Sequence, residues 1–187
     1  MRLFVALEIP SAVREKLAAL IEALRALSPQ TRWVRPENLH VTLKFIGEVP
    51  EARLAGIRAA LAGIRLDQPC TLDFRGLGFF PNEKQPRVLW VGIEGSLNLK
   101  TLAADIDLAM EPLGIPRDQR PFSPHLTLSR FERSRPPEKL RAAIQENAVR
   151  DFGSLRTSTF HLIESKLKPS GAEYTTLESF AFAVAEA

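Results

Sequence analysis

The sequence predicts a mixed fold of the α+β or α/β class, built from two copies of one unit. Strand-like and helix-like segments follow the order strand, helix, strand pair, helix, strand, and this order occurs twice. The stretch HVTL at 40–43 is matched by HLTL at 125–128, which lies 85 residues further on (125 − 40). We therefore divide a single domain, 1–187, into repeat halves of approximately 1–84 and 85–187.

The first half begins with a strand at 2–9, which is rich in Val, Leu and Phe. A helix is predicted at 11–28, where apolar residues recur every three or four positions and form one stripe. After the HVTL strand, a second helix is predicted at 50–64, where proline and glutamate suit the first turn. A strand at 71–80 completes the half.

The second half repeats this order, and the same spacing aligns its first strand, from Arg87, with the strand that starts at Arg2. A Ser-Gly turn at 170–171 then leads into one more strand. Duplication of this kind predicts a pseudo-twofold axis, with the two His-Thr strands facing each other. The elements expected after the first strand are a helix at 96–114, the HLTL strand, a helix at 136–149, and strands at 157–167 and 174–182.

The composition is that of a soluble globular protein, with 45% hydrophobic and 25% charged residues. A net charge of +3 is only a weak indication of a polyanionic partner. Cys70 is the single cysteine, which excludes an internal disulfide and a Cys-rich zinc site. No apolar run approaches the roughly 20 residues of a membrane helix, so we expect a cytoplasmic protein without membrane association or an obligate protein partner.

Strand alternation divides the HVTL strand into two faces, because successive side chains point in opposite directions. His40, Thr42 and Lys44 are predicted to share the polar face. The apolar face, expected to fill the core, comprises Leu39, Val41, Leu43 and Phe45.

In the HLTL strand, His125, Thr127 and Ser129 are predicted to share the polar face. Strict alternation places Arg130 on the opposite, apolar face unless the strand ends or bulges before it. The third histidine, His161, has no threonine two residues later, and we expect it to make a structural hydrogen bond.

Two histidines and two threonines suit chemistry at phosphorus. An imidazole with a pKa of about 6.5 can give or take a proton near neutrality, so one histidine can act as general base while the other acts as general acid. The hydroxyls of Thr42 and Thr127 can donate hydrogen bonds to non-bridging phosphate oxygens. Lys44 or Arg130 could balance the phosphate charge.

Other uses of these residues are less well supported by the sequence. Two histidines alone lack the further ligands that zinc requires, so we expect neither a metal nor a cofactor. Aromatic side chains can stack on nucleobases, and Phe122, beside the second motif, is the candidate for this role. Trp90, within VLWVGI, is expected to lie in the core.

With its paired HVT and HLT motifs, the chain resembles the 2H phosphoesterase superfamily. More narrowly, it is similar to the branch of RNA 2′,3′-cyclic phosphodiesterases, also called 2′-5′ RNA ligases. The resemblance runs through most of the chain, in the stretches RLFVALEIP, RWVRPENLHVTLKFIGEV, PRVLWVGIE, FSPHLTLSRF and ESKLKPSGAEYTTLESF.

The resemblance implies a bilobal α+β fold, in which two pseudo-twofold-related lobes, each with a mainly antiparallel sheet and two helices, flank a central cleft. It implies metal-independent opening of a 2′,3′-cyclic phosphate on RNA to a 2′-phosphate, with 2′-5′ ligation as a reverse reaction that needs no ATP. By this resemblance His40 is the acid and His125 the base, while Thr42, Thr127 and Arg130 bind the phosphate. The expected partner is RNA with a cyclic phosphate end, and tRNA fragments are among the candidates.

Two other functions remain open from the sequence. The same motifs could act on a small cyclic phosphate, such as a cyclic nucleotide or an ADP-ribose cyclic phosphate. Alternatively, the protein could be a module that binds RNA ends without chemistry. Histidines and threonines argue against the binding module, because binding alone would be better served by Arg and Lys.

Overall fold

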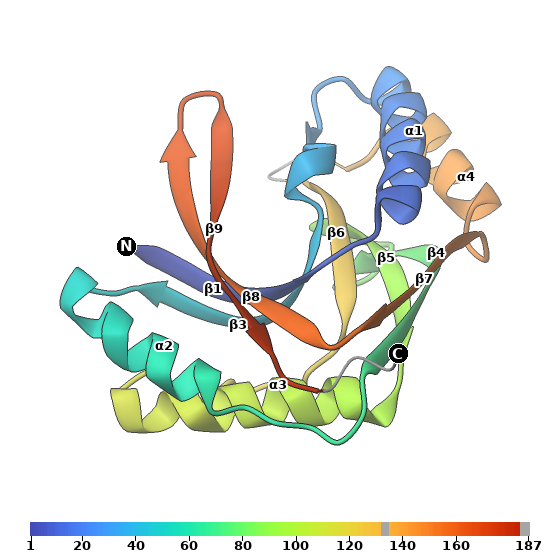
Figure 1. The fold of residues 1–187 in the computed structure, drawn as a ribbon. Coiled ribbons are helices and arrows are strands. Elements are labelled where there is room, and N and C mark those ends of the chain that lie inside the picture. Colours follow the sequence, from blue (N-terminus) through green and yellow to red (C-terminus); the bar gives the residue numbers. More distant parts are fainter. Residues whose placement is uncertain (132–134, 184–187) are drawn as a thin grey trace.

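The computed structural model describes residues 1–131 and 135–183, which form two antiparallel sheets and four α-helices (Figure 1). In the first half of the chain the elements are β1 (Arg2–Glu8), α1 (Ser11–Leu27), β2 (Arg32–Trp33), η1 (Pro36–Asn38), β3 (His40–Glu48), η2 (Glu51–Arg53), α2 (Leu54–Ala62) and β4 (Cys70–Phe80). In the second half they are β5 (Val88–Gly95), α3 (Leu97–Met110), η3 (Glu111–Leu113), β6 (His125–Arg130), α4 (Glu138–Glu146), β7 (Asp151–Thr157), β8 (Thr159–Lys168) and β9 (Gly171–Ala181).

Every strand pairing in the described residues is antiparallel, so the fold is α+β and the α/β alternative is excluded. The first sheet has the strand order β3-β1-β8-β9, and the second has the order β2-β6-β5-β4-β7. In Figure 1, α2 and α3 lie on one side of the molecule and α1 and α4 on the other. Helix α2 contacts β9 of the first sheet, α1 contacts β7 of the second sheet, and α4 contacts β4 of the second sheet. Helix α3 contacts both sheets, through β3 of the first and through β4 and β5 of the second.

The two sheets exchange elements between the sequence halves. The first sheet combines β1 and β3 with the hairpin β8–β9 from the end of the chain. The second sheet takes β2 and β4 from the first half and β5, β6 and β7 from the second. Because each sheet needs strands from both halves, neither half can complete its own sheet.

Strand β1 is buried on both faces, which explains its nearly continuous apolar run. Its odd-numbered residues, Leu3, Val5 and Leu7, belong to the main core. On the other face, Phe4 and Ala6 pack with Ile163 of β8 and Tyr174 of β9 in a smaller apolar cluster. The ring of His40 lies against this second face, over Phe4.

The internal repeat is visible in the strand pairing, with one correction to the predicted alignment. Thr42 pairs with Ala6, and Thr127 pairs with Trp90. Ala6 is therefore equivalent to Trp90, an offset of 84 residues (90 − 6), so the alignment of Arg2 with Arg87 was wrong by one residue. A one-residue shift exchanges the two faces of a strand. Trp90 is therefore equivalent to Ala6, and not to Val5, which lies in the main core.

Two strands were not predicted from the sequence. Strand β2 has only two residues, too few for any periodic pattern. Strand β7 contains Gly153 with φ of 113°, a conformation that glycine adopts readily and that interrupts the strand pattern.

Candidate active site

Strand β3 contains a β-bulge immediately after Thr42. Thr42 pairs with Ala6 of β1, but the next residue of β1 towards its start, Val5, pairs with Lys44. Leu43 is therefore an extra residue in β3, and it reverses the alternation of the side chains that follow it, up to a second irregularity at Ile46. As a result, Lys44 turns towards the core, and Phe45 returns to the face of His40.

Strand β6 has the same bulge at the equivalent place. Thr127 pairs with Trp90 of β5, and Ser129 pairs with the adjacent Leu89, so Leu128 is the extra residue. Arg130 then pairs with Val88, which lies on the same face of β5 as Trp90. Arg130 therefore shares its face with Thr127, and the bulge that the sequence left open is present. The prediction that Ser129 lies beside Thr127 was wrong, because the bulge turns Ser129 to the opposite face, where it is buried.

These bulges correct two predictions about β3. Lys44 was expected beside His40, but its side chain is 2% exposed and its ammonium group forms ion pairs with Asp107 and Asp118. Phe45 was expected in the core, but 61% of its surface is exposed. Both errors have one cause, because local alternation cannot reveal an extra residue that only the pairing with β1 defines.

The two motif histidines are oriented in the same way. His40 Nδ1 lies 2.6 Å from the backbone oxygen of Asn38, and His125 Nδ1 lies 2.9 Å from that of Ser123. Because a carbonyl oxygen can only accept a hydrogen bond, Nδ1 carries the proton in both rings. The other ring nitrogen, Nε2, is therefore left for chemistry in each histidine.

His40 lies in a more apolar environment than His125. Its ring centroid is 4.8 Å from that of Phe4 and 5.3 Å from that of Tyr174. Burial lowers the pKa of His40; the Asn38 carbonyl partly opposes this, and the positive charge of Arg130 reinforces it. His125, in contrast, is an exposed side chain.

Arg130 connects the two motifs electrostatically. Strands β3 and β6 contact each other, although they belong to different sheets. From β6, the guanidinium of Arg130 lowers the pKa of His40 on β3. It also counteracts the rise that burial causes in the pKa of Tyr174 on β9. The structure thus gathers side chains of both motifs at one site.

Other candidates lie in different surroundings. Trp90 was expected in the core, but it is half-buried on the face of Thr127, and its indole lies against Gly78. Phe122 packs against the main core and borders an open pocket beside the start of α3. The structural hydrogen bond expected for His161 is confirmed, because its Nδ1 lies 2.8 Å from Ser179 Oγ.

Sequence reasoning missed the roles of Asn38 and Ser123 as the acceptors for the two histidines. The signal was available, because each residue lies two positions before its histidine in both halves. No group of three His, Cys, Asp or Glu side chains in the described parts of the chain is arranged to hold a metal ion. None of the described helices is both long and apolar enough to cross a membrane.

Two strands in contact, each with a histidine and a threonine on one face, define a phosphoesterase of the two-histidine class. The family described as LigT like Phosphoesterase matches residues 7–90 and 91–174, one match for each half. The chain belongs to this family, and both the predicted family and the predicted fold class are confirmed.

Individual relatives support this assignment. The chain is 37% identical to the RNA 2′,3′-cyclic phosphodiesterase of Archaeoglobus fulgidus, over 96% of this chain and 99% of the relative. The crystal structure of TT0787 of Thermus thermophilus has a TM-score of 0.77 and 35% identity, over 97% of this chain and 98% of that one. Escherichia coli LigT complexed with 3′-AMP has a TM-score of 0.72 and 28% identity, over 97% of each chain.

Proposed function

We propose that the protein hydrolyses the 2′,3′-cyclic phosphate at an RNA end to a 2′-phosphomonoester, without a metal ion. The observation that carries this proposal is the matched orientation of His40 and His125, each with Nδ1 bonded to a backbone carbonyl and Nε2 left for proton transfer. Two such groups on contacting strands suit a displacement that needs a base and an acid together.

The proposed step begins when water attacks the phosphorus of the cyclic phosphate. His125 Nε2 takes the proton from the attacking water as its oxygen bonds to phosphorus. The bond from phosphorus to the 3′ oxygen breaks, and His40 Nε2 gives its proton to that oxygen. One water is consumed, the phosphate stays on the 2′ oxygen, and exchange with solvent returns both histidines to their starting states.

The acid role of His40 depends on the bound phosphate. In the free protein the lowered pKa of His40 favours its neutral form near neutral pH. The negative charge of a bound cyclic phosphate opposes this effect and favours the protonated form. The exposed side chain of His125 is accessible to water, which supports its role as the base.

Stabilisation of the phosphate is assigned to Thr42, Thr127 and Arg130. Each lies on the same face of its strand as the histidine of that strand. The hydroxyls can donate to the non-bridging oxygens, and a guanidinium can donate two parallel hydrogen bonds to them. Donors already in place where charge develops lower the barrier, because they need no rearrangement during the reaction.

Arg32 favours RNA over a small cyclic phosphate as the substrate. Arg32 of β2 pairs directly with Arg130 of β6, so both side chains lie on one face of the sheet, and both are exposed. A guanidinium can donate two parallel hydrogen bonds to a phosphate. A substrate with a second phosphate, such as the next internucleotide phosphate of RNA, would place one phosphate at each of these two arginines.

Two more features agree with an RNA end. The exposed ring of Phe45, on the face of His40 and Thr42, offers a surface on which a nucleobase can stack. The name of the relative from Archaeoglobus fulgidus also specifies an RNA cyclic phosphate. If an RNA 5′-hydroxyl replaces water as the nucleophile, the same displacement forms a 2′-5′ linkage without ATP.

The test uses a short RNA ending in a 2′,3′-cyclic phosphate, incubated with the protein in excess EDTA, with the products separated as 2′-phosphate, 3′-phosphate or unchanged RNA. We expect the 2′-phosphate. A 3′-phosphate product would contradict the assignment of the 3′ oxygen as leaving group. Binding without conversion would favour the RNA-end-binding module, and no binding would favour a small cyclic phosphate, which a nucleoside 2′,3′-cyclic phosphate tests in parallel.

A further inference from the structure

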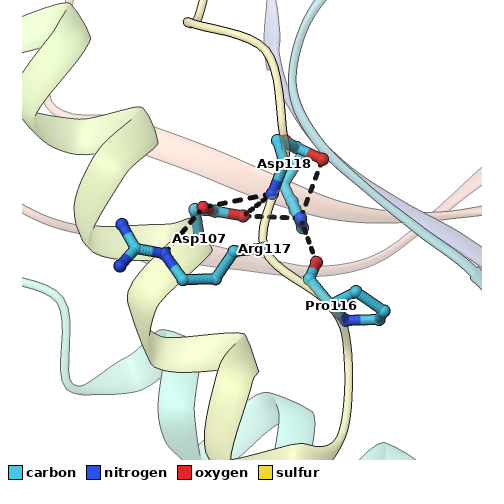
Figure 2. A network of polar contacts seen from close by, with 5 residues as sticks. Asp107, Pro116, Arg117 and Asp118 are labelled. Atoms are coloured by element: carbon cyan, nitrogen blue, oxygen red, sulfur yellow. Dashed lines mark hydrogen bonds and ion pairs between the residues drawn. The ribbon is translucent and has the colours of Figure 1, made fainter.

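The ammonium group of Lys44 is buried behind the site and has three close partners. Its Nζ lies 2.5 Å from Asp107 Oδ1 on α3, 2.8 Å from the backbone oxygen of Pro116 and 2.9 Å from Asp118 Oδ1. Figure 2 shows these partners together with Arg117, whose Nε lies 3.3 Å from Asp107 Oδ2. Burying a charge is costly, so a buried ion pair is weak evidence of a purely stabilising role.

The internal repeat allows Lys44 of β3 to be compared with its equivalent in β6, Ser129. Lys44 and Ser129 each come directly after the extra residue of the bulge, and both turn away from the face of the histidine. Ser129 is fully buried, and its Oγ has no hydrogen-bond partner among the described residues. The inward position after the bulge therefore has a strong polar tether in β3 and lacks a comparable one in β6.

The difference is explained by the segments that flank the two site strands. Beside β6, residues 32–34 pair through the backbone: Trp33 pairs with Ser129, and Val34 N donates to Leu128 O at 2.8 Å. The equivalent segment in the second half, 85 residues later, is 117–119 (32 + 85 to 34 + 85). No residue of this fully described segment belongs to a strand. Lys44 instead binds Asp118 within the segment and the backbone oxygen of Pro116 just before it.

This tether lies close to His125 along the chain. Six residues, 119–124, separate Asp118 from His125. One of them is Ser123, whose carbonyl oxygen holds His125 Nδ1. Asp118 is fixed at two points, because its backbone N–H also donates to Asp107 Oδ1 at 3.1 Å.

We propose that Lys44 is a positioning residue that, through Asp118, sets the segment that orients His125. Lys44 thereby links β3, the strand of His40, to the chain segment that precedes His125. Lys44 contacts no substrate in this arrangement. Its effect on turnover rests on the proposed function, whereas its effect on the His125 ring does not.

Two variants test the tether, Lys44→Met and Asp118→Ala. Asp118 is more than half exposed, so its alanine variant should fold even if the lysine variant does not. We expect kcat on a cyclic-phosphate RNA to fall about tenfold to a hundredfold, because small misplacements of catalytic groups have effects of this order. We expect KM to stay within about threefold, because the phosphate-binding side chains remain.

Long-range ¹H–¹⁵N spectra of the imidazoles provide a readout that needs no turnover. In Asp118→Ala, we expect His125 to lose its single Nδ1–H tautomer while His40 keeps it. Asp118→Asn, which retains an acceptor oxygen, should restore both kcat and the spectrum. Lys139→Met, on an exposed lysine of α4, is the matched control and should resemble the wild type.

The proposal would be overturned by an unchanged His125 spectrum in Asp118→Ala. It would also be overturned if kcat stayed within threefold of wild type in both tether variants, or if the Asn and Ala variants of Asp118 lost activity equally. If the wild type shows no turnover, the proposed function fails, and the His125 spectrum alone decides on the tether.

Discussion

Phe45 and Arg130 occupy equivalent positions on the two site strands. Each lies five residues after its histidine, and each is returned to the face of that histidine by one bulged leucine. The repeat is therefore symmetric in its backbone, histidines and threonines, but asymmetric at this later position. One strand contributes an exposed aromatic ring and the other a cation, and in the proposed function this difference favours one orientation of a substrate that has both a base and a phosphate.

Replacing either motif histidine should nearly abolish turnover. We expect His40→Ala and His125→Ala each to lower kcat by about 10²–10⁴-fold, because each removes a proton-transfer group. The measurement is single-turnover hydrolysis of a cyclic-phosphate RNA. His161→Ala is the control and should remain within about threefold of wild type, and a loss below tenfold in either motif variant would contradict the two-histidine mechanism.

The pH dependence of turnover should report the lowered pKa of His40. The kcat/KM profile reports ionisations of the free protein, in which burial, with Arg130 adding to it, lowers the pKa of His40 from its ordinary 6.5. The active form needs a protonated His40 and a neutral His125, so kcat/KM should be bell-shaped, with the lower of the two pKa values setting the rising limb and the higher one the falling limb, whichever residue is the acid. One midpoint should therefore report the lowered pKa of His40 and lie below 6.5, and a profile in which both midpoints lie above 6.5 would contradict a catalytic ionisation of His40.

Removing the charge of Arg130 should raise the pKa of His40, because its positive charge disfavours the protonated imidazole. Arg130→Met tests this by NMR titration of the His40 ring, a measurement that needs no substrate. Arg130→Lys keeps the charge and should give a smaller rise. Arg65→Met, on an exposed arginine that bonds to nearby backbone oxygens, is the control. An unchanged titration in Arg130→Met would show that Arg130 does not act on His40.

Arg32 should matter only for substrates with more than one phosphate. We expect Arg32→Ala to lower kcat/KM for a cyclic-phosphate oligonucleotide by about tenfold to a hundredfold, the order of one charge-assisted contact of 1.5–3 kcal/mol. Turnover of a nucleoside 2′,3′-cyclic phosphate should be unchanged. The salt dependence of oligonucleotide binding should become shallower by about one ion. Equal losses on both substrates would contradict a role in binding the second phosphate.

Asp107 should be important for folding stability. Asp107→Ala leaves Lys44 with a buried charge and fewer partners, and breaking a buried pair costs about 3–5 kcal/mol of unfolding free energy. Urea unfolding at pH 7 measures this loss, with Glu111→Ala on the exposed surface as control. A loss below about 1 kcal/mol would place the pair among weak surface contacts.

The same variant has a defined pH dependence. Burial acts to raise the pKa of Asp107, but the hydrogen bonds from Lys44, the Asp118 amide and Arg117 outweigh it, and the net effect lowers the pKa below 3.8. A lowered carboxyl pKa stabilises the fold above the unfolded-state value and loses this effect as pH falls through the folded-state value. The difference in unfolding free energy between wild type and Asp107→Ala should therefore shrink below about pH 4.

The sequence alone indicated the family and the general fold. Two His-x-Thr motifs 85 residues apart predicted the family, the repeated order of strands and helices limited the fold to the α+β or α/β class, and the family resemblance implied the α+β class. The individual strands and helices could be predicted because the alternation of a strand and the apolar stripe of a helix are patterns within a short stretch of sequence.

Only the tertiary structure decided which side chains share the site. The bulges at Leu43 and Leu128 are defined by pairing with β1 and β5, far away in the sequence, and they alone move Phe45 and Arg130 to the site face and Lys44 into the interior. Pairing with a distant strand fixes register, and an extra residue exchanges the faces of the side chains that follow it. Local periodicity does not reveal an extra residue, so the positions of Phe45 and Lys44 could be found only from the folded chain, whereas the family resemblance had already indicated Arg130 as a phosphate ligand.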